Sequence, residues 1–455
     1  MRRLFLIFLL TSRVAFGQDP DSVIIRKMFD MALDQGQSYE NLRSLCKDIG
    51  GRLTGSAGAE MAVYWGENKM KACGFDKVYL QKFKAPHWER GTKEAAWIKD
   101  EKGEIKKVEV LALGGSVGTN GLLDGEIVKF ETLEDLKEAE KREVEGKIVF
   151  LSQAMDNKQI HTFNAYGESI PNRGLGAIEA AKKGALAVVI RSLGLPVDEY
   201  PHTGSLMYSD DVKKIPGAAL ATRDAELLTD WLDQGKVNFL LEMNCSELDS
   251  AVTYNVIGEI SGTSNKDEII SVGGHLDSWD VAEGAHDDGA GLMHSLEAFR
   301  ILKELGYQPR HTLRVVFFMN EENGDMGGIS YARFASEAGE VHVAAIESDA
   351  GGFSPRGFDI NNATPLFFEK VQEAVQIFKP YELYSFEKGF AGTDIGPLKS
   401  YYPEIVLFGL VPDSQRYFDF HHTAADVFEN VNKRELEMGC ASMAAMLYLI
   451  DQKLL

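Results

Sequence analysis

The C-terminal half of the chain alternates between short apolar runs and longer segments with helical periodicity. The apolar runs that follow Thr253 are NVIGEI, EIISVGGH, TLRVVFFMN, HVAAIESD and EIVLFGLV. The segments with apolar residues at every third or fourth position are 291–305, 328–337, 365–378 and 431–450. Near-continuous apolar strands that alternate with helices are typical of a parallel sheet covered on both faces. The pattern therefore predicts an α/β fold with a mixed, mostly parallel central sheet and ligand sites beyond the carboxyl ends of its strands.

The N-terminal half has a different pattern. Residues 21–70 show helical spacing, and the three alternating segments KVYLQKFKA, AAWIKD and KKVEVLAL favour strands. After the glycine-rich break GGSVGTNG, short strands such as GKIVFLS and LAVVIRS surround one helix, LGAIEAAKKG. We interpret residues 118–246 as a small β-rich domain inserted into a larger domain that is formed by residues 18–117 and 247–455.

The first 17 residues favour export. Arg2 and Arg3 precede an apolar run at residues 4–10, and a small-x-small ending follows at Ala15 and Gly17. This is the pattern of a secretory signal peptide that is cleaved before Gln18. We therefore expect a periplasmic or extracellular protein, or one on the secretory or lysosomal route if the source is eukaryotic. No other apolar run approaches the roughly 18 residues of a membrane span.

Charge and cysteine content exclude several classes of partner. The net charge of the 455 residues is -21, which argues against binding to nucleic acid or to an anionic membrane. The four cysteines have no CxxC spacing, so they predict neither a zinc finger nor a disulfide scaffold. Pairing of Cys46 with Cys73 and the oligomeric state stay open, and a homodimer is compatible with the sequence.

Polar residues follow nearly every strand of the C-terminal half. In chain order they are His275, Asp277, Asp287, Glu321, Glu322, Asp349, His421, His422 and Asp426. Taken alone, each has an ordinary structural explanation: an aspartate before a helix is most often a cap, and paired glutamates at a strand end are most often solvated. Their convergence on one edge of a parallel sheet instead predicts a functional site.

The side-chain types in this set indicate a metal centre. Two imidazoles and three or four carboxylates without a thiolate match a binuclear site for zinc or a similar divalent metal better than a structural zinc site. A carboxylate that bridges two metals holds them about 3.5–4 Å apart, which suits a shared hydroxide that attacks a carbonyl.

The ordered motifs GGHLDSWD, GAHDDGAG, NEENG, ESDAGG and FHHTAAD resemble those of the M28 family of metallopeptidases. The resemblance also includes GGRLTGSAGAE, HTG and KIPGAALATRDAE, and so covers essentially the whole mature chain. It implies a zinc-exopeptidase-like fold and identifies the insert as similar to a protease-associated (PA) domain. It further implies two zinc ions, one bound by His275 and Asp349 and the other by Glu322 and His422, with Asp287 as the bridge.

The resemblance assigns further roles and shows where the chain departs from the family. It implies that Glu321 is the general base, that Asp277 orients an imidazole, and that a cis peptide follows the bridging aspartate. The SDH sequence of many members is replaced here by GTDI, which contains Asp394 but no histidine, and relatives often carry tyrosine in place of His421. Stabilisation of the oxyanion or contact with the substrate is therefore assigned to three candidates, His421, Tyr417 and Asp394.

These observations predict an exported exopeptidase that hydrolyses short, unblocked peptides, with dipeptides as the expected substrates. Dipeptidase, aminopeptidase and carboxypeptidase activity all fit, because the sequence leaves open which peptide terminus is the main anchor. Two alternatives remain. One is an acyltransferase with a single zinc ion, similar to glutaminyl cyclase, and the other is a non-catalytic, receptor-type relative. The complete ligand set favours the peptidase.

Overall fold

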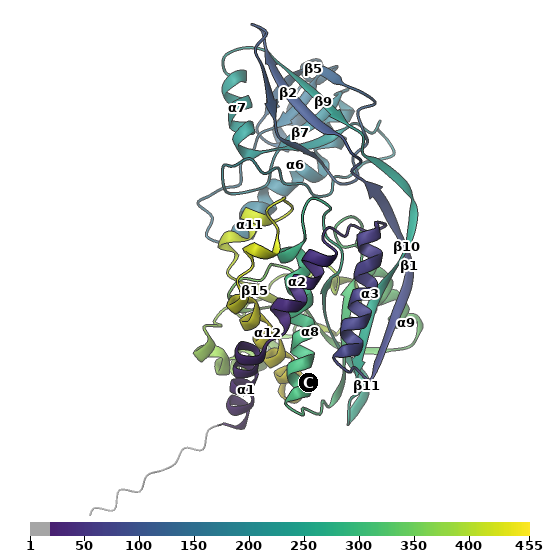
Figure 1. Ribbon diagram of the computed structural model, residues 1–455. Coiled ribbons are helices and arrows are strands. Elements are labelled where there is room, and N and C mark those ends of the chain that lie inside the picture. The colour runs from purple at the N-terminus through teal and green to yellow at the C-terminus, as the bar shows by residue number, and fades with distance from the viewer. Residues whose placement is uncertain (1–18) are drawn as a thin grey trace, which may run out of the picture.

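The computed structural model describes residues 19–455, which form two stacked units, each built on its own β-sheet (Figure 1). The predicted signal peptide at residues 1–17 lies outside the described residues. Within the described chain, no helix combines the length and the apolar character that crossing a membrane requires.

The lower unit contains a seven-stranded sheet in the order β1-β10-β12-β11-β13-β15-β14. Its strands are β1 (Lys77–Glu89), β10 (Ser246–Ile260), β11 (Asn265–His275), β12 (His311–Phe318), β13 (Val341–Glu347), β14 (Pro355–Asn361) and β15 (Val406–Pro412). The four central strands, from β12 to β15, are parallel, whereas β1, β10 and β14 pair antiparallel at the edges. The sheet is therefore mixed, as predicted, with its parallel part at the centre.

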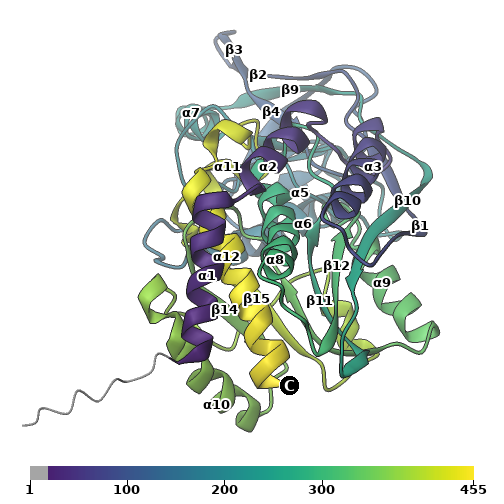
Figure 2. The same ribbon diagram turned by 60° about the horizontal axis from the view of Figure 1, so that its bottom comes forward.

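Helices cover both faces of this sheet, because its strands are apolar on both sides. In β12, Leu313 and Phe317 pack into the core on one face, while Val316 and Phe318 pack with Tyr331 on the other. Figure 2 shows α1, α12 and α8 side by side across the first face. The helices on this face are α1 (Pro20–Gln35), α2 (Ser38–Asp48), α3 (Ala57–Ala72), α8 (Ala290–Glu304) and α12 (Lys433–Leu449). The other face is covered by α9 (Met326–Glu337), and α10 (Pro365–Ala374) and α11 (Tyr417–Phe420) lie in the connections.

The upper unit is an eight-stranded sheet in the order β3-β2-β9-β5-β6-β7-β8-β4. Its strands are β2 (Glu94–Asp100), β3 (Ile105–Val108), β4 (Val110–Ala112), β5 (Leu123–Phe130), β6 (Ile148–Leu151), β7 (Ala187–Arg191), β8 (Gly217–Leu220) and β9 (Val237–Met243). Four helices accompany them: α4 (Leu133–Glu138), α5 (Lys141–Val144), α6 (Thr162–Lys182) and α7 (Thr222–Leu232). The sheet starts earlier in the chain than residue 118, because β2 pairs with β9 over its whole length and β4 pairs with β8.

The two units are joined by the longest strand pair of the molecule as described. β1 and β10 run antiparallel from Lys77 opposite Glu259 to Glu89 opposite Ser246, with one irregularity between Ala85 and His87. Figure 1 shows this pair rising along one side from the lower sheet to the upper unit. The upper unit is thereby held over the carboxyl ends of the parallel strands.

Candidate metal centre

The polar residues predicted to meet at one edge of the sheet do so. β11 ends at His275, the Glu321-Glu322 pair follows β12, and Asp349 follows β13. Because β12, β11 and β13 are parallel neighbours, their carboxyl ends lie together. The order of the parallel strands therefore brings these three sites together, although Asp349 comes 74 positions after His275 (349 − 275).

Asp287, in the turn just before α8, lies between two groups of potential ligands. Its Oδ1 is 3.0 Å from Nε2 of His275, and its Oδ2 is 3.2 Å from Nε2 of His422. The same His275 nitrogen is 3.5 Å from Oδ1 of Asp349. Asp287 is only 5% exposed, and its Oδ2 accepts no hydrogen bond from the described residues. A buried carboxylate with one oxygen directed at each histidine fits the position of a ligand that bridges two metal ions.

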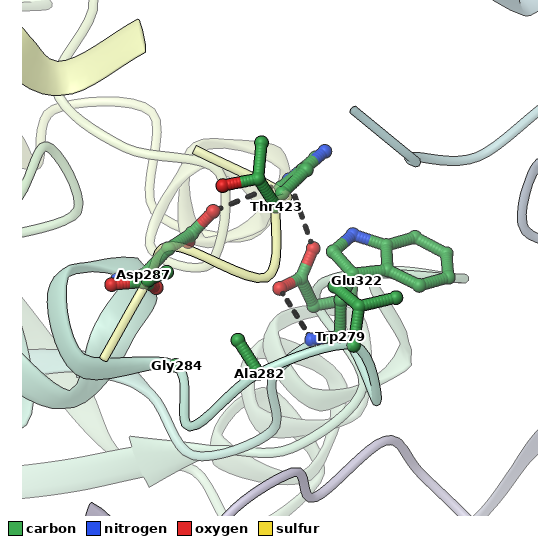
Figure 3. A pocket seen from close by; sticks show the side chains of 9 residues that line it. Trp279, Ala282, Gly284, Asp287, Glu322 and Thr423 are labelled. Carbon is green, nitrogen blue, oxygen red and sulfur yellow. Dashed lines mark hydrogen bonds and ion pairs between the residues drawn. The ribbon is translucent and has the colours of Figure 1, made fainter. Parts of the chain in front are cut away.

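The second ligand group, Asp287, Glu322 and His422, is supported by the upper unit. Oε2 of Glu322 lies 3.2 Å from Nε2 of His422, and Oε1 accepts a hydrogen bond from the Trp279 backbone (Figure 3). The other ring nitrogen of His422 lies 3.3 Å from the carbonyl oxygen of Thr203, whose N–H donates to the His422 carbonyl. The Ser205 hydroxyl donates to the Glu322 carbonyl at 2.8 Å. A carbonyl that holds the free nitrogen of a ligand imidazole fixes its tautomer and orientation.

The Asp277 carboxylate binds the backbone of the segment after β12 that carries Glu321. Its Oδ1 accepts hydrogen bonds from the backbone N–H groups of Asn320 and Glu321, at 2.8 and 3.1 Å. Nδ1 of His275 is closer to the Asp277 carbonyl oxygen, at 3.0 Å, than to its carboxylate, at 3.8 Å. The imidazole is therefore oriented by the backbone of Asp277, where the sequence predicted its carboxylate, and the carboxylate fixes the strand end that presents Glu321.

Further contacts fix the loop that presents Asp287. The Asp426 carboxylate accepts hydrogen bonds from the backbone N–H groups of His286 and Asp287, at 2.7 and 3.1 Å. The fully buried Arg52, from the glycine-rich GGRLTGSAG motif, donates to three backbone carbonyls within residues 276–284. The peptide bond between Asp287 and Asp288 is cis, as the family resemblance implied.

The site holds more acidic groups than the adjacent histidines can neutralise. Among the described residues, no lysine or arginine forms an ion pair with Asp287, Glu321, Glu322 or Asp349. Burial and the neighbouring acids raise the pKa of Glu321, Glu322 and Asp349. Burial acts in the same direction on Asp287, but the adjacent histidines hold its pKa well below the usual range. Buried carboxylates are costly unless they are paired or bind metal, so this donor set fits divalent cations.

A cavity of about 1260 Å³ opens over these groups and is lined from both units. His421 and Tyr417 both line it. The His421 ring stacks on His422 with 3.5 Å between centroids, and its Nε2 is 3.8 Å from Oδ2 of Asp287. Asp394 is buried outside the lining, and its carboxylate oxygens have no hydrogen-bond partner among the described residues. The structure therefore brings two of the three oxyanion or substrate candidates to the cavity.

Three residues of the site had not been singled out from the sequence. Arg173 of α6 lines the cavity, and Thr203 and Ser205 contact the second ligand group. The HTG motif pointed to Thr203 only as part of the family resemblance. Arg173 carried a weaker signal, as the one basic residue in the stretch SIPNRGLGAIEA.

Comparison with known proteins agrees with this geometry. The model of Peptidase family M28 matches residues 255–447. Carboxypeptidase Q of Xenopus laevis is 35% identical over 89% of this chain and 84% of its own. A Peptidase M28 precursor from Shewanella amazonensis SB2B, 32% identical, superimposes with a TM-score of 0.90 over 95% of this chain and 96% of its own. A zinc aminopeptidase from Bacillus subtilis shares the fold, with a TM-score of 0.63 at 21% identity over 90% of this chain and 93% of its own.

Proposed function

The chain belongs to peptidase family M28 and is a metallopeptidase, and from this membership we propose that it is an exported exopeptidase with two zinc ions that hydrolyses short, unblocked peptides, chiefly dipeptides. The observation that carries the proposal is the position of Asp287, with one oxygen 3.0 Å from His275 and the other 3.2 Å from His422. A single-metal site needs ligands on only one side of this carboxylate.

The proposed ligands divide into two sets that share Asp287. His275 and Asp349 would hold one ion, and Glu322 and His422 the other, which is the division that the family resemblance implies. When bound, the two ions would lower the pKa of a coordinated water and polarise the peptide carbonyl. Other divalent metals would suit the same nitrogen and oxygen donors.

Glu321 is the proposed general base. Its side chain lines the cavity, and its carboxylate accepts no hydrogen bond from the described residues, so it is free to take a proton from the attacking water and return it to the leaving amine. Asp277 holds Glu321 in place through the backbone. His421 and Tyr417, which face the same cavity, are the proposed groups for contact with the developing oxyanion.

The upper unit is proposed to act as the PA-like insert that covers the site. It lines the cavity through α6 and residues 205–207, which restricts access to ligands small enough to enter. A covered cleft of this kind favours short peptides over folded proteins.

The proposal is tested with a panel of dipeptides, N-blocked and C-blocked dipeptides and a longer peptide, each assayed after chelation and after addition of zinc. We expect hydrolysis of unblocked dipeptides that is lost with chelator and restored by zinc. Efficient cleavage within the longer peptide would contradict an exopeptidase. Acyl transfer without hydrolysis, with one metal per chain, would favour the alternative similar to glutaminyl cyclase, and no turnover of any substrate would favour the receptor-type alternative.

A further inference from the structure

The buried side chain of His286 contacts each segment from which a ligand reaches the metal centre on a loop. These loop-borne ligands are Asp287, Asp349 and His422. His286 directly precedes Asp287 in the turn before α8 and is only 1% exposed. It is not one of the proposed ligands, and it is not among the described residues that line the cavity. Its ring therefore acts on the protein segments around it and not on a bound peptide.

The two ring nitrogens have partners in two different ligand-bearing segments. The backbone N–H of Gly352, in the ESDAGG motif that carries Asp349, donates to Nδ1 at 3.1 Å. Nε2 lies 3.3 Å from the carbonyl oxygen of Asn430, and the Asn430 side chain donates to the Ala425 carbonyl in the loop that carries His422. Because Nδ1 faces an N–H group and Nε2 faces a carbonyl, the neutral ring protonated at Nε2 satisfies both contacts.

The ring also packs against the same two segments. It is nearly parallel to the ring of Phe353, with 4.4 Å between centroids and 4° between planes, and to that of Phe420, with 5.2 Å and 16°. Phe353 follows Asp349 in its segment, Phe420 precedes His422, and both phenylalanines are buried. Stacked aromatic pairs stabilise a structure beyond the area that they bury, so packing and hydrogen bonds link the same segments.

Another buried histidine close to the site makes contact with only one of these segments. Nδ1 of His294, in α8, lies 2.8 Å from the hydroxyl of Ser348, and its Nε2 has no partner among the described residues. His286 is different because both ring nitrogens and the backbone are bound, the backbone N–H donating to Asp426 at 2.7 Å.

The three linked ligands need this support because they lie in connections between the elements of the lower unit, whereas His275 closes strand β11. Connections are more mobile than the elements they join. Ligands that are already in place lose less conformational entropy when an ion binds. A residue that holds all three therefore favours the binding of both ions.

We propose that His286 is a positioning residue for both metal ions, because its ring fixes the bridging Asp287 relative to one ligand of each ion. The inference rests on the proposed function, in which the first ion is bound by His275 and Asp349 and the second by Glu322 and His422. The hydrogen bond at Nδ1 positions the segment that serves the first ion. The hydrogen bond at Nε2 positions the segment that serves the second ion.

The test is a titration of zinc into chelator-stripped protein, in competition with a chromophoric chelator. Asp349→Ala and Glu322→Ala each remove a ligand of one ion and so identify the two affinities. His286→Phe keeps an aromatic ring but removes both hydrogen bonds. We expect it to bind both ions roughly 10- to 100-fold more weakly, the usual effect of changing the partners of metal ligands.

His342→Phe is the matched control. His342 is likewise buried, has a partner at each ring nitrogen, Ser271 and Glu340, and packs against the rings of Tyr331 and Tyr402. It lies at the amino end of β13, away from the ligands. Its substitution should therefore leave both zinc affinities unchanged.

Two further substitutions separate the two hydrogen bonds of His286. Asparagine places an oxygen acceptor near the position of Nδ1, and glutamine places an N–H donor near that of Nε2. His286→Asn should therefore shift the ratio of the two affinities toward the first ion, and His286→Gln toward the second, by up to roughly 10-fold. The ratio is measured because the loss of stacking acts on both ions. This pair of variants carries the test if His286→Phe does not fold.

Three outcomes would overturn the inference while the two-metal peptidase stands. They are unchanged affinities in His286→Phe, an equal loss in His342→Phe, and the same affinity ratio in His286→Asn and His286→Gln, which would mean that the ring acts only through packing. A wild-type protein that is fully active with one ion or none would refute the proposed function, and this inference with it.

Discussion

The buried acids at the two ends of the seven-stranded sheet differ in their basic partners. At the amino ends of the parallel strands, Arg314 of β12 pairs with Glu259 and Glu340, at 2.8 and 2.6 Å, and His311 lies 2.8 Å from Asp451. At the carboxyl ends, the described residues offer the acids only histidines, and His275 and His422 each lie close to at least two carboxylates.

The difference indicates that the acids at the carboxyl ends need a positive charge that the side chains there do not supply. An acid removed from water must be paired, neutralised or bound to metal, and at the amino ends arginine and histidine provide the partner. At the carboxyl ends the positive charge has to arrive with a cation. The lack of an arginine partner for the described acids at the carboxyl ends therefore supports a metal site there, as the ligands themselves do.

The largest expected effect separates the adjacent glutamates at the carboxyl end. Glu321→Gln should keep both metals while kcat falls by roughly 10²–10⁴, the usual contribution of a general base, because glutamine keeps the size but cannot accept the proton. Glu322→Ala should instead lose one metal together with activity. Metal content and turnover measured on both variants check this.

A particular outcome would reverse these two roles. If Glu321→Gln turns over normally while Glu322→Gln retains both metals and is inert, Glu322 is the base and Glu321 is a ligand. The acids at the carboxyl end would still need metal, but the division of the ligands would be wrong.

A smaller effect tests whether the upper unit supports only the second ligand group. Gly204 has a φ of +125° and borders both His422 and Arg173, so Gly204→Ala should displace the imidazole. We expect roughly 10- to 100-fold weaker binding of one metal, as for changes around other metal ligands, and unchanged binding of the other. Stepwise metal titration measures both affinities.

Gly121→Ala is the control for this substitution. Gly121 also has a positive φ, +106°, but nothing lies within 4 Å of the added methyl group. It should carry a similar backbone penalty and leave both metal affinities unchanged. If Gly204→Ala weakens the binding of both metals equally, the upper unit supports both ligand groups and not the second group alone.

The smallest effect concerns the amino end of the sheet. Arg314 and His342 hold the pKa of Glu340 at about 2 against the opposing effect of burial. A depressed carboxyl pKa contributes stability above the unfolded value, near 4.3 for glutamate, and this stability is lost as the pH falls toward 2. Glu340→Gln should therefore lower the free energy of unfolding by about 1–3 kcal/mol at pH 7, and by progressively less below pH 4.

Urea denaturation of the metal-loaded protein across this pH range checks the prediction. Glu337→Gln is the control, because the Glu337 side chain is 63% exposed and its contact with Arg333 is 3.9 Å, so stability should hardly change. Metal content should be the same in both variants. A loss of metal in Glu340→Gln would mean that the two ends of the sheet are not independent.

The sequence predicted the central sheet and the convergence of its ligands because both follow from local patterns. Apolar runs such as TLRVVFFMN define buried parallel strands, and parallel strands necessarily bring the residues after them to one edge. His275, Glu322 and Asp349 could therefore be placed together before any contact was seen. The identity of the bridging residue depended on the family resemblance.

Other features depend on contacts that leave no periodic signal. The helix α6 starts at Thr162, well before the predicted LGAIEAAKKG segment. The sequence did not predict this start because Gly167 and Pro171, in the first half of the helix, both disfavour a helix interior. Thr203 supports His422 through its backbone carbonyl, which any residue could supply. Asp277 likewise contacts the imidazole through its carbonyl, while its carboxylate binds N–H groups more than 40 residues away.

The central claim is that two divalent ions, joined by Asp287, supply the positive charge that the carboxyl end of the sheet lacks. It is tested most directly by elemental analysis of active, full-length protein, with protein concentration and turnover measured on the same sample. The account predicts two zinc or equivalent divalent ions per chain, and activity that is lost on chelation and regained as the second ion binds. One ion or none in fully active protein would contradict it.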